Sequence, residues 1–374
     1  MPELPEVETV RRGLSRLIVG KKVIHVSCDT PKSFPNPPEE AAQFLIGASV
    51  TAVHRRAKVL LIELSSGYTL VTHLKMTGQL VFIEHEQRGE GRGKREENND
   101  IALHLPSAIS RLPSSAASQR FGGGHPNDSL VGELPDKSTR VILEFDSPKI
   151  GNGLESDTRK QRNAEQTVGE LPSASTGVGD VVAGQEIWRS FWPRQKAGQI
   201  GPCLFFNDQR KFGWMRLMPS IEVPNIDFMK RLGPEPLEDD FTPEILYERL
   251  QRRKNTSIKA ALLDQSVVAG IGNIYADESL WGARLHPATL VRNIPYSIFQ
   301  ILCHEIKYVL DLSLQKGGST DKNYVDAEGK RGSYLTFAHV FRREGQPCPR
   351  CGTIIEKLRV AGRGTHICPH CQRV

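Results

Sequence analysis

Long apolar segments are absent from this sequence, since no run approaches the roughly 18 residues that a membrane-crossing helix needs. An apolar segment is also missing behind the N-terminus, where acidic side chains stand instead, so we expect no secretory signal peptide. These absences predict a cytoplasmic protein without membrane contact. With 374 residues, of which 38% are hydrophobic and 25% charged, the chain is long enough for two or three domains.

Cysteine is scarce over most of the chain. Three of the seven cysteines are scattered and are expected to be buried apolar residues, namely Cys28, Cys203 and Cys303. The other four form two Cys-x-x-Cys pairs with 16 residues between them, which is typical of paired zinc knuckles on a β-hairpin. Disulfides or free thiols are the alternatives, and a cytosolic chain disfavours them. The pattern predicts one structural Zn²⁺ with a closed four-sulfur site, whose ligands are Cys348, Cys351, Cys368 and Cys371.

Positive charge is concentrated at the C-terminal end. The net charge of +6 is modest, but from Ala338 onward the sequence has seven Arg or Lys residues and only two acidic ones. This distribution indicates a basic module that binds nucleic acid. Between the two cysteine pairs, Arg363 stands in the sequence AGRGT at the expected hairpin tip, where glycines allow close approach and a guanidinium suits a phosphate. A plain solvated turn is the alternative.

The N-terminal sequence PELPEVET places Pro2 directly ahead of several carboxylates. Removal of Met1 would leave Pro2 with a free secondary amine, whose pKa near 8 lies below the roughly 10.4 of a lysine side chain. The neutral fraction of this amine can attack an electrophilic carbon, and with a sugar aldehyde it gives an iminium, an electron sink for eliminations. The alternative is a helix start, since Pro5, Glu6 and Glu8 suit a first turn. Both interpretations can hold together.

The hydrophobic patterns predict an α+β fold. Helical spacing over residues 5–18 is followed by short β-rich stretches, which indicate an antiparallel sandwich or barrel; they are KKVIHVSC, SVTAVHRRAKVLLIEL, YTLVTHLKMTGQLVFI, TRVILEF and PCLFFND. Residues 86–136 and 147–200 are polar and Gly-rich, and we expect solvated, partly disordered insertions there. Within the second, EIWRSFWPR (186–194) could contact DNA or fold back onto the sandwich, and we favour folding back.

The pattern becomes helical in the C-terminal half. Thr242 is a good N-cap, and a long apolar stripe over 298–312 predicts a further helix. Residues 258–287 predict helix, Gly-containing turns and helix, an arrangement that presents N–H groups to an anion. Lys259 and Asn273 are the expected phosphate contacts there. A helical hairpin that merely packs is the alternative.

Several sequence blocks occur in one order: PELPEVETV, RRAKVLLIEL, THLKMTG, NDQRKFG, LGPEPL, IKAALLDQ, GIGNIYADESL and the four-cysteine finger. Together they resemble the formamidopyrimidine-DNA glycosylase family, bacterial enzymes that remove oxidised purines, over nearly the whole chain except the two insertions. The resemblance implies a catalytic β-sandwich domain with flanking helices over 1–222, a helix–two-turn–helix domain over 223–336 and a zinc-finger hairpin over 337–374. It implies damaged double-stranded DNA as the partner of a monomer, with zinc as the cofactor.

The resemblance also implies catalytic roles. Pro2 would attack C1′ of the damaged nucleoside and form a Schiff base, Glu3 would protonate the ring oxygen, and Glu6 would orient the site. Lys58 would stabilise charge near the lesion phosphate rather than remain an ordinary surface lysine, and Arg363 would act with it. Base loss followed by β- and δ-elimination would make the protein a DNA glycosylase with AP lyase activity in base excision repair.

A second implied group of residues binds DNA. Met76, Arg210 and Phe212 would fill the gap that a flipped nucleotide leaves, with Arg210 reading the orphaned cytosine. Core packing is the alternative for Met76 and Phe212. The resemblance also implies that the Gly-rich segment over 319–334 closes over the flipped base. The lack of apolar periodicity in this segment fits a mobile lid.

Two departures from the family pattern concern DNA contacts. In KSTRV, Ser138 and Arg140 replace histidines, and Arg140 becomes the expected DNA-binding residue of that strand. In VFRREG, Phe341 lacks the hydroxyl of the usual tyrosine. Neither change removes catalytic chemistry.

Three other classes compete with this interpretation. An endonuclease VIII-like enzyme for oxidised pyrimidines is disfavoured by PELPE and NDQRKFG, because those relatives generally begin PEGPE and lack the same arginine–phenylalanine pair. A non-catalytic DNA-binding protein of the same fold would have lost Pro2, Glu3 or Lys58, and all three are present. An unrelated zinc-ribbon module would leave the N-terminal block unexplained.

Overall fold

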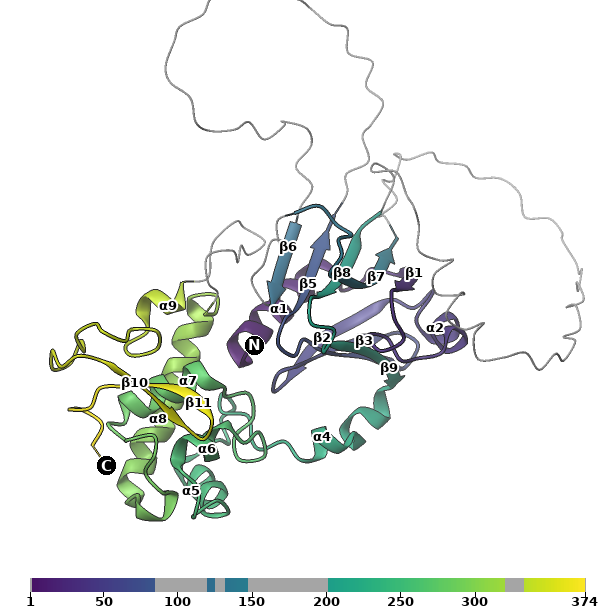
Figure 1. Cartoon of the computed structure of the whole chain (residues 1–374). Helices are drawn as coiled ribbons and strands as arrows, with labels where there is room; N and C mark the ends of the chain where they lie inside the picture. Colours follow the sequence, from purple (N-terminus) through teal and green to yellow (C-terminus); the bar gives the residue numbers. More distant parts are fainter. Residues whose placement is uncertain (1, 85–119, 125–131, 147–200, 320–332, 374) are drawn as a thin grey trace, which may run out of the picture.

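The N-terminal part of the chain is a sandwich of two antiparallel sheets (Figure 1). A computed structural model describes residues 2–84, 120–124, 132–146, 201–319 and 333–373. The sheets have the strand orders β1-β7-β8-β5-β6 and β2-β3-β4-β9. The strands are β1 (Val23–Cys28), β2 (Val50–Arg56), β3 (Val59–Leu64), β4 (Tyr68–His73), β5 (Gly78–Ile83), β6 (Arg120–Gly124), β7 (Thr139–Phe145), β8 (Cys203–Asp208) and β9 (Trp214–Pro219). The predicted sandwich is confirmed.

Helix α1 (Leu4–Leu17) contacts both sheets through β2 and β6. It begins where the sequence predicts, because Glu3 and Glu6 form a capping box that satisfies backbone N–H groups of the first turn. Its apolar face enters the core between the sheets. Gly13 is required there, since a Cβ at this position would lie 2.1 Å from Cζ of Phe121. The N-terminus of α1 therefore lies at a fixed place beside the helical domain (Figure 1).

Two strands differ from the sequence-based expectation. Strand β6 lies inside the predicted insertion 86–136, so that prediction is wrong for residues 120–124, which pair with β5. Its sequence RFGGG has no apolar alternation, and its position depends on Phe121 packing against α1. Strand β9 was not predicted and pairs with β4. The segment EIWRSFWPR and the rest of 147–200 lie outside the described residues.

The C-terminal half is helical and has its own apolar core. Thr242 caps α5 as predicted, with its side chain accepting from the N–H of Ile245 at 3.4 Å. The predicted boundaries after residues 222 and 336 fall inside η2 and α9, respectively. The helices outside α1 are α2 (Pro38–Phe44), η2 (Ser220–Asn225), α4 (Asp227–Lys230), α5 (Pro243–Gln251), α6 (Ile258–Leu263), α7 (Asn273–Gly282), η3 (Val291–Asn293), α8 (Tyr296–Gln315) and α9 (Tyr334–Phe337).

The chain ends in a two-stranded hairpin, β10 (Glu356–Val360) and β11 (Arg363–Ile367), which packs on α7 (Figure 1). Its two-residue loop has φ of 49° at Ala361 and 75° at Gly362, and positive φ at both positions is the signature of a type I′ turn. Arg363 directly follows this turn. Within the described residues, no helix combines the length and apolarity needed to span a membrane.

Candidate active site and zinc finger

A cleft of about 1240 Å³ separates the sandwich from the helical part and the finger. It brings together residues far apart in the sequence: the N-terminus, the β2–β3 turn, the β4–β5 loop, the start of α7 and the hairpin tip. The predicted site residues among its lining are Pro2, Glu3, Glu6, Lys58, Met76, Asn273 and Arg363. Pro2 is buried, as are the two carboxylates behind it.

Glu3 is held in the cleft by contacts at both of its ends. Its backbone N–H donates to Glu6 Oε2 at 2.8 Å, and its Oε1 accepts the N–H of Ile274 at 3.1 Å. Gly272 permits this approach, because a Cβ there would lie 2.2 Å from the Glu3 carboxyl carbon. Burial raises the pKa of Glu3 to about 7; the nearby Lys58 lowers it and Glu6 raises it further. Glu3 is therefore available in its protonated form near neutral pH.

Glu6 connects the N-terminal helix to the helical domain. Its Oε1 accepts from the hydroxyl of Tyr275 at 2.6 Å and from Ser319 through both its backbone N–H (2.7 Å) and its hydroxyl (2.6 Å). Burial, assisted by the two nearby carboxylates, raises the pKa of Tyr275 well above its ordinary value, so its hydroxyl keeps its proton. Ser319 begins the predicted lid segment, and most of that segment, 320–332, lies outside the described residues.

Lys58 is the second residue of the tight β2–β3 turn and lines the cleft. Its Nζ donates to the carbonyl of Ile271 at 2.7 Å. Burial lowers the pKa of Lys58, while the carboxylates of Glu3 and Glu6 act in the opposite direction. With 7% of its surface exposed, Lys58 is not an ordinary surface lysine.

The turn that contains Lys58 is held by Glu235 of the LGPEPL block. The Glu235 carboxylate accepts the N–H of Ala57, whose φ is 52°, and forms ion pairs of 2.9 Å with Arg55 and Arg56. A residue outside the sandwich, in the segment ahead of α5, thus fixes a turn of the sandwich.

Met76, Arg210 and Phe212 form one exposed group at the ends of two neighbouring loops. Met76 is 41% exposed and Phe212 46% exposed, which rules out core packing in this structure. The Arg210 guanidinium lies 5.0 Å from the Phe212 ring centroid, and its Nη1 lies 3.4 Å from Met76 Sδ. The structure thus presents the Met76 thioether, the Phe212 ring and the Arg210 guanidinium together. Side chains of this kind can be inserted between stacked bases.

Asp208, which is fully buried, shapes the loop that carries Arg210 and Phe212. Its Oδ2 accepts the N–H groups of Phe212 (2.7 Å) and Gly213 (2.6 Å). Arg140 supports this loop from below, donating from Nε to the Asp208 carbonyl at 2.8 Å and pairing with Asp29. Arg140 is only 5% exposed, and its guanidinium donates to protein acceptors. The predicted direct contact with DNA is therefore corrected: Arg140 supports the loop that carries Arg210 and Phe212.

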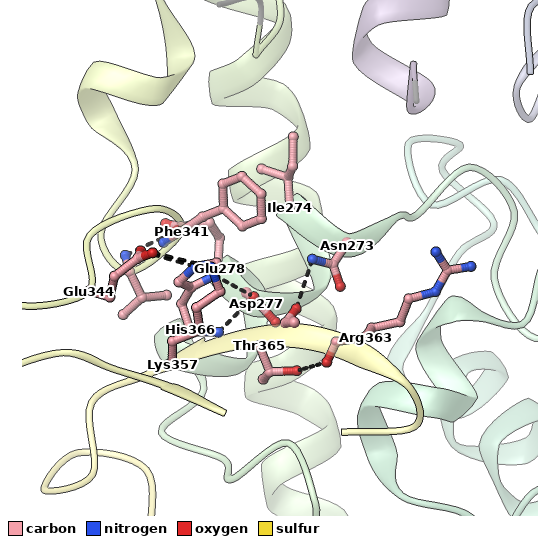
Figure 2. Close-up of polar contacts among 12 residues, drawn as sticks. Asn273, Ile274, Asp277, Glu278, Phe341, Glu344, Lys357, Arg363, Thr365 and His366 are labelled. Atoms are coloured by element: carbon pink, nitrogen blue, oxygen red, sulfur yellow. Dashed lines mark hydrogen bonds and ion pairs between the residues drawn. The ribbon is translucent and has the colours of Figure 1, made fainter. Parts of the chain in front are cut away.

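Lys259 also differs from its prediction. It is fully buried, and its three N–H bonds go to Asp277 Oδ1 (2.6 Å), Thr365 Oγ1 (2.7 Å) and the Gly364 carbonyl (3.1 Å), which leaves none for a phosphate. Asn273 donates to the same carbonyl at 3.0 Å and lines the cleft (Figure 2). It begins α7 and is not its N-cap, because Gly272 takes that position. Arg363 is exposed and extends away from this network (Figure 2).

The four predicted zinc ligands converge at the base of the finger. Their sulfur atoms all lie within 4.8 Å of one another. Cys351 Sγ lies 3.4 Å from Cys368 Sγ and 3.5 Å from Cys371 Sγ. Zn–S bonds of about 2.3 Å in a tetrahedron place sulfurs about 3.8 Å apart, so the donor set fits one zinc ion and leaves no open position. Zinc held there has a structural role.

Three family models match the chain in order: the formamidopyrimidine-DNA glycosylase N-terminal domain over 1–160, its H2TH domain over 232–324, and a zinc finger found in FPG and IleRS over 345–374. A formamidopyrimidine-DNA glycosylase of Pediococcus pentosaceus is 34% identical over 372 residues, which span 100% of this chain and 99% of the relative. The chain belongs to the formamidopyrimidine-DNA glycosylase family. It is a DNA-binding repair enzyme with one structural zinc.

Other formamidopyrimidine-DNA glycosylases agree with this assignment. The protein of Chloroflexus aggregans is 34% identical over 373 residues, covering 100% of this chain and 98% of its own. A solved complex of the Lactococcus lactis protein with DNA containing an abasic site has a TM-score of 0.68 and 26% identity, with 100% of both chains covered. MutM in complex with DNA containing carbocyclic 8-oxo-G has a TM-score of 0.67, the same identity and the same coverage.

Sequence reasoning on this glycosylase missed two residues, the cleft-lining His73 and the buried Tyr275 behind Glu6. His73 lies within the THLKMTG block, and burial followed by the charges of Lys75 and Lys58 lowers its pKa to about 3, so its imidazole is neutral. Its Nδ1 accepts the N–H of Lys75 at 3.0 Å. Tyr275 lies in GIGNIYADESL, and no sequence pattern indicates that it contacts a site residue. An aromatic residue within a helix is ordinarily interpreted as part of the hydrophobic core.

Proposed function

We propose that this enzyme is a bifunctional glycosylase and AP lyase that excises oxidised purines, 8-oxoguanine and formamidopyrimidines, from duplex DNA. The proposal depends on one observation: Pro2, Glu3 and Lys58 line one cleft, and Glu3 has a pKa of about 7. This arrangement supports roles for Pro2 as nucleophile, Glu3 as proton donor and Lys58 as the cation that stabilises charge. Solved relatives in complex with DNA that contains Fapy-dG or carbocyclic 8-oxo-G support the substrate class.

The reaction divides between these groups. The Pro2 amine, freed by removal of Met1, forms a bond to C1′, and the damaged base departs with the electron pair of the glycosidic bond. The proton that the Pro2 nitrogen loses goes to the departing base. Glu3 gives its proton to O4′, the C1′–O4′ bond breaks, and an iminium remains between C1′ and the Pro2 nitrogen. Loss of a C2′ proton then expels the 3′ phosphate, and a second elimination expels the 5′ phosphate. Lys58 and Arg363 offset phosphate charge during these steps.

The exposed Met76, Arg210 and Phe212 group supports binding to a nucleotide that has left the stack. Extruding a nucleotide costs a few kcal/mol, and an apolar wedge with an aromatic ring can replace the lost stacking. Arg210 supplies donors for the base left without its partner. Action as a monomer in the cytoplasm stays a prediction.

Borohydride trapping tests the covalent step. Duplex DNA with 8-oxoguanine opposite cytosine should give a covalent complex at the N-terminal peptide, and a Pro2→Gly variant should cleave far more slowly. The matched control is a chain extended ahead of Pro2, in which the nitrogen is an amide and no complex should form. Full trapping by that extended chain would contradict the mechanism, and undamaged duplex measures the background.

A further inference from the structure

Asp277 is a fully buried carboxylate on α7 that takes no part in the proposed chemistry. Both of its oxygens are turned to groups that hold the finger. Oδ1 accepts from Lys259 Nζ at 2.6 Å. Oδ2 accepts the backbone N–H of His366 at 3.0 Å and lies 3.3 Å from His366 Nδ1 (Figure 2). A buried carboxylate with charged and backbone donors on both oxygens fixes its partners in one geometry.

A continuous set of contacts runs from Asp277 to Arg363. Lys259 donates to Thr365 Oγ1 at 2.7 Å, and this hydroxyl in turn donates to the Arg363 carbonyl at 3.1 Å. Lys259 also donates to the Gly364 carbonyl at 3.1 Å. The backbone on the C-terminal side of Arg363 is therefore held from α6 and α7, through groups that are themselves buried.

The turn on the other side of Arg363 has little support of its own. A Cβ built at Gly362 would meet no atom within 4 Å. A two-residue turn that projects into open space is positioned by its strands. The orientation of the Arg363 side chain in the cleft thus depends on how β11 is attached to α7.

We propose that Asp277 is a positioning residue, which fixes β11 through His366 and Lys259 and so sets where the Arg363 guanidinium meets a DNA phosphate. This inference rests on the proposed function, because it needs Arg363 to act on the DNA. It gives the buried Lys259 a use that differs from phosphate binding. It also gives His366, which is surplus as a zinc ligand, a place in the site.

A double-mutant cycle tests the proposal. Arg363→Ala should lower the single-turnover rate of 8-oxoguanine excision by about tenfold to a hundredfold, the range for losing a hydrogen bond to a charged group. Asp277→Asn keeps the shape of the side chain and should lower the rate about tenfold. In the Arg363→Ala background, Asp277→Asn should have little further effect, since it acts through the residue already removed.

Thr365→Val is the second variant, in case the buried Asp277→Asn side chain prevents folding. It preserves volume and charge while removing the hydroxyl between Lys259 and the Arg363 carbonyl. It should lower the rate severalfold, again only while Arg363 is present. Zinc content should equal that of the parent protein in every variant.

Glu278→Gln is the matched control. Glu278 is the next residue of α7 and is fully buried, and it holds the finger elsewhere, through the N–H groups of Val340 (2.9 Å) and Phe341 (2.8 Å). The loss of excision rate in Glu278→Gln should be the same whether Arg363 is present or replaced by Ala. Equal coupling of both carboxylates to Arg363 would overturn the proposal, because it would indicate general loosening of the finger.

Hydrogen exchange separates failure of this inference from failure of the proposed function. In Asp277→Asn, the amide of His366 and its neighbours in β11 should exchange faster than in the parent. Unchanged exchange would refute the positioning role. If exchange is faster in Asp277→Asn but Arg363→Ala has normal activity, the function proposed for Arg363 is contradicted instead. If the losses of excision rate in Asp277→Asn and Arg363→Ala simply add, the link between the two residues is overturned.

Discussion

The hydroxyl of Tyr275 lies 2.6 Å from both Glu6 Oε1 and Ser313 Oγ, so one phenol joins α1 to α7 and α8. Removing this hydroxyl leaves a carboxylate that has lost one of its donors. Tyr275→Phe should therefore lower the free energy of unfolding by about 1.5 to 3 kcal/mol, the range for a hydrogen bond to a charged group. It should also lower the excision rate, because Glu6 holds the backbone of Glu3. Urea denaturation and single-turnover assays measure the two effects. Tyr334, whose ring neighbours that of Tyr275, supplies the control. Tyr334→Phe should lower the free energy of unfolding and the excision rate by less than Tyr275→Phe does.

Glu3 predicts an unusual dependence of stability on pH. Its pKa is about 7 in the folded protein, raised by burial from 4.5. Below pH 4.5 the Glu3 carboxyl is protonated in both the folded and the unfolded protein, so its burial does not lower the free energy of unfolding. As the pH rises to about 7, the carboxyl ionises first in the unfolded protein, and the free energy of unfolding falls. Glu3→Gln should therefore stabilise the protein by up to about 3 kcal/mol at pH 8 and by little at pH 4. Denaturation at both pH values checks this, and an equal gain at both would contradict it.

Phe212 should matter for catalysis and little for folding. Because its ring is 46% exposed, Phe212→Ala should change the free energy of unfolding by no more than about 0.5 kcal/mol. Stacking of an aromatic ring on a base contributes about 1 to 3 kcal/mol, so excision should slow by about tenfold or more. Rates with double-stranded 8-oxoguanine substrate test this. Ile221→Ala, at a residue 84% exposed outside the cleft lining, should leave the rate unchanged.

Zinc removal should release the finger and leave the sandwich folded. The four thiolates form a closed site, and structural zinc in small fingers contributes about 10 kcal/mol or more to their folding. After chelation, DNA affinity should fall at least about tenfold, while strand content measured by circular dichroism should change little. Added Zn²⁺ should restore binding. Cys303→Ala, in the helical core, should keep its zinc and serves as the control.

Ala361 stores strain that a substitution can relieve. A non-glycine residue with positive φ costs roughly 1 kcal/mol, and Asn tolerates this conformation better than Ala. Ala361→Asn should therefore raise the free energy of unfolding by about 0.5 to 1 kcal/mol. Ala361→Val, with a β-branched side chain at the same turn, should lower it. A stabilising valine would show that the loop does not adopt a type I′ turn.

The sequence was sufficient where local patterns and side-chain chemistry agree. The β-rich stretches, the Thr242 cap and the two Cys-x-x-Cys pairs are each recognisable within a short run of sequence, and each is found in the structure. Strand β6 could not be predicted, because RFGGG becomes a strand only by pairing with β5 and packing on α1. A pattern without alternation carries no signal for such long-range contacts.

The same limit applies to the candidate site. A lysine next to a Gly-rich turn suggests a phosphate contact, and Lys259 instead finds Asp277 and Thr365 from two other elements. Arg140 was assigned by its position in a strand, but the structure places it beneath the loop of Asp208. Whether a cation is free or paired depends on distant carboxylates: Asp277 lies 18 residues from Lys259, and Asp29 lies 111 residues from Arg140.

Glu235 joins the two sides of the cleft. It lies within the matched H2TH domain, yet its carboxylate holds the β2–β3 turn, which contains Lys58, through Ala57, Arg55 and Arg56. One buried carboxylate therefore fastens a wall of the sandwich to the helical part, and a single substitution at this position would loosen both sides of the cleft at once.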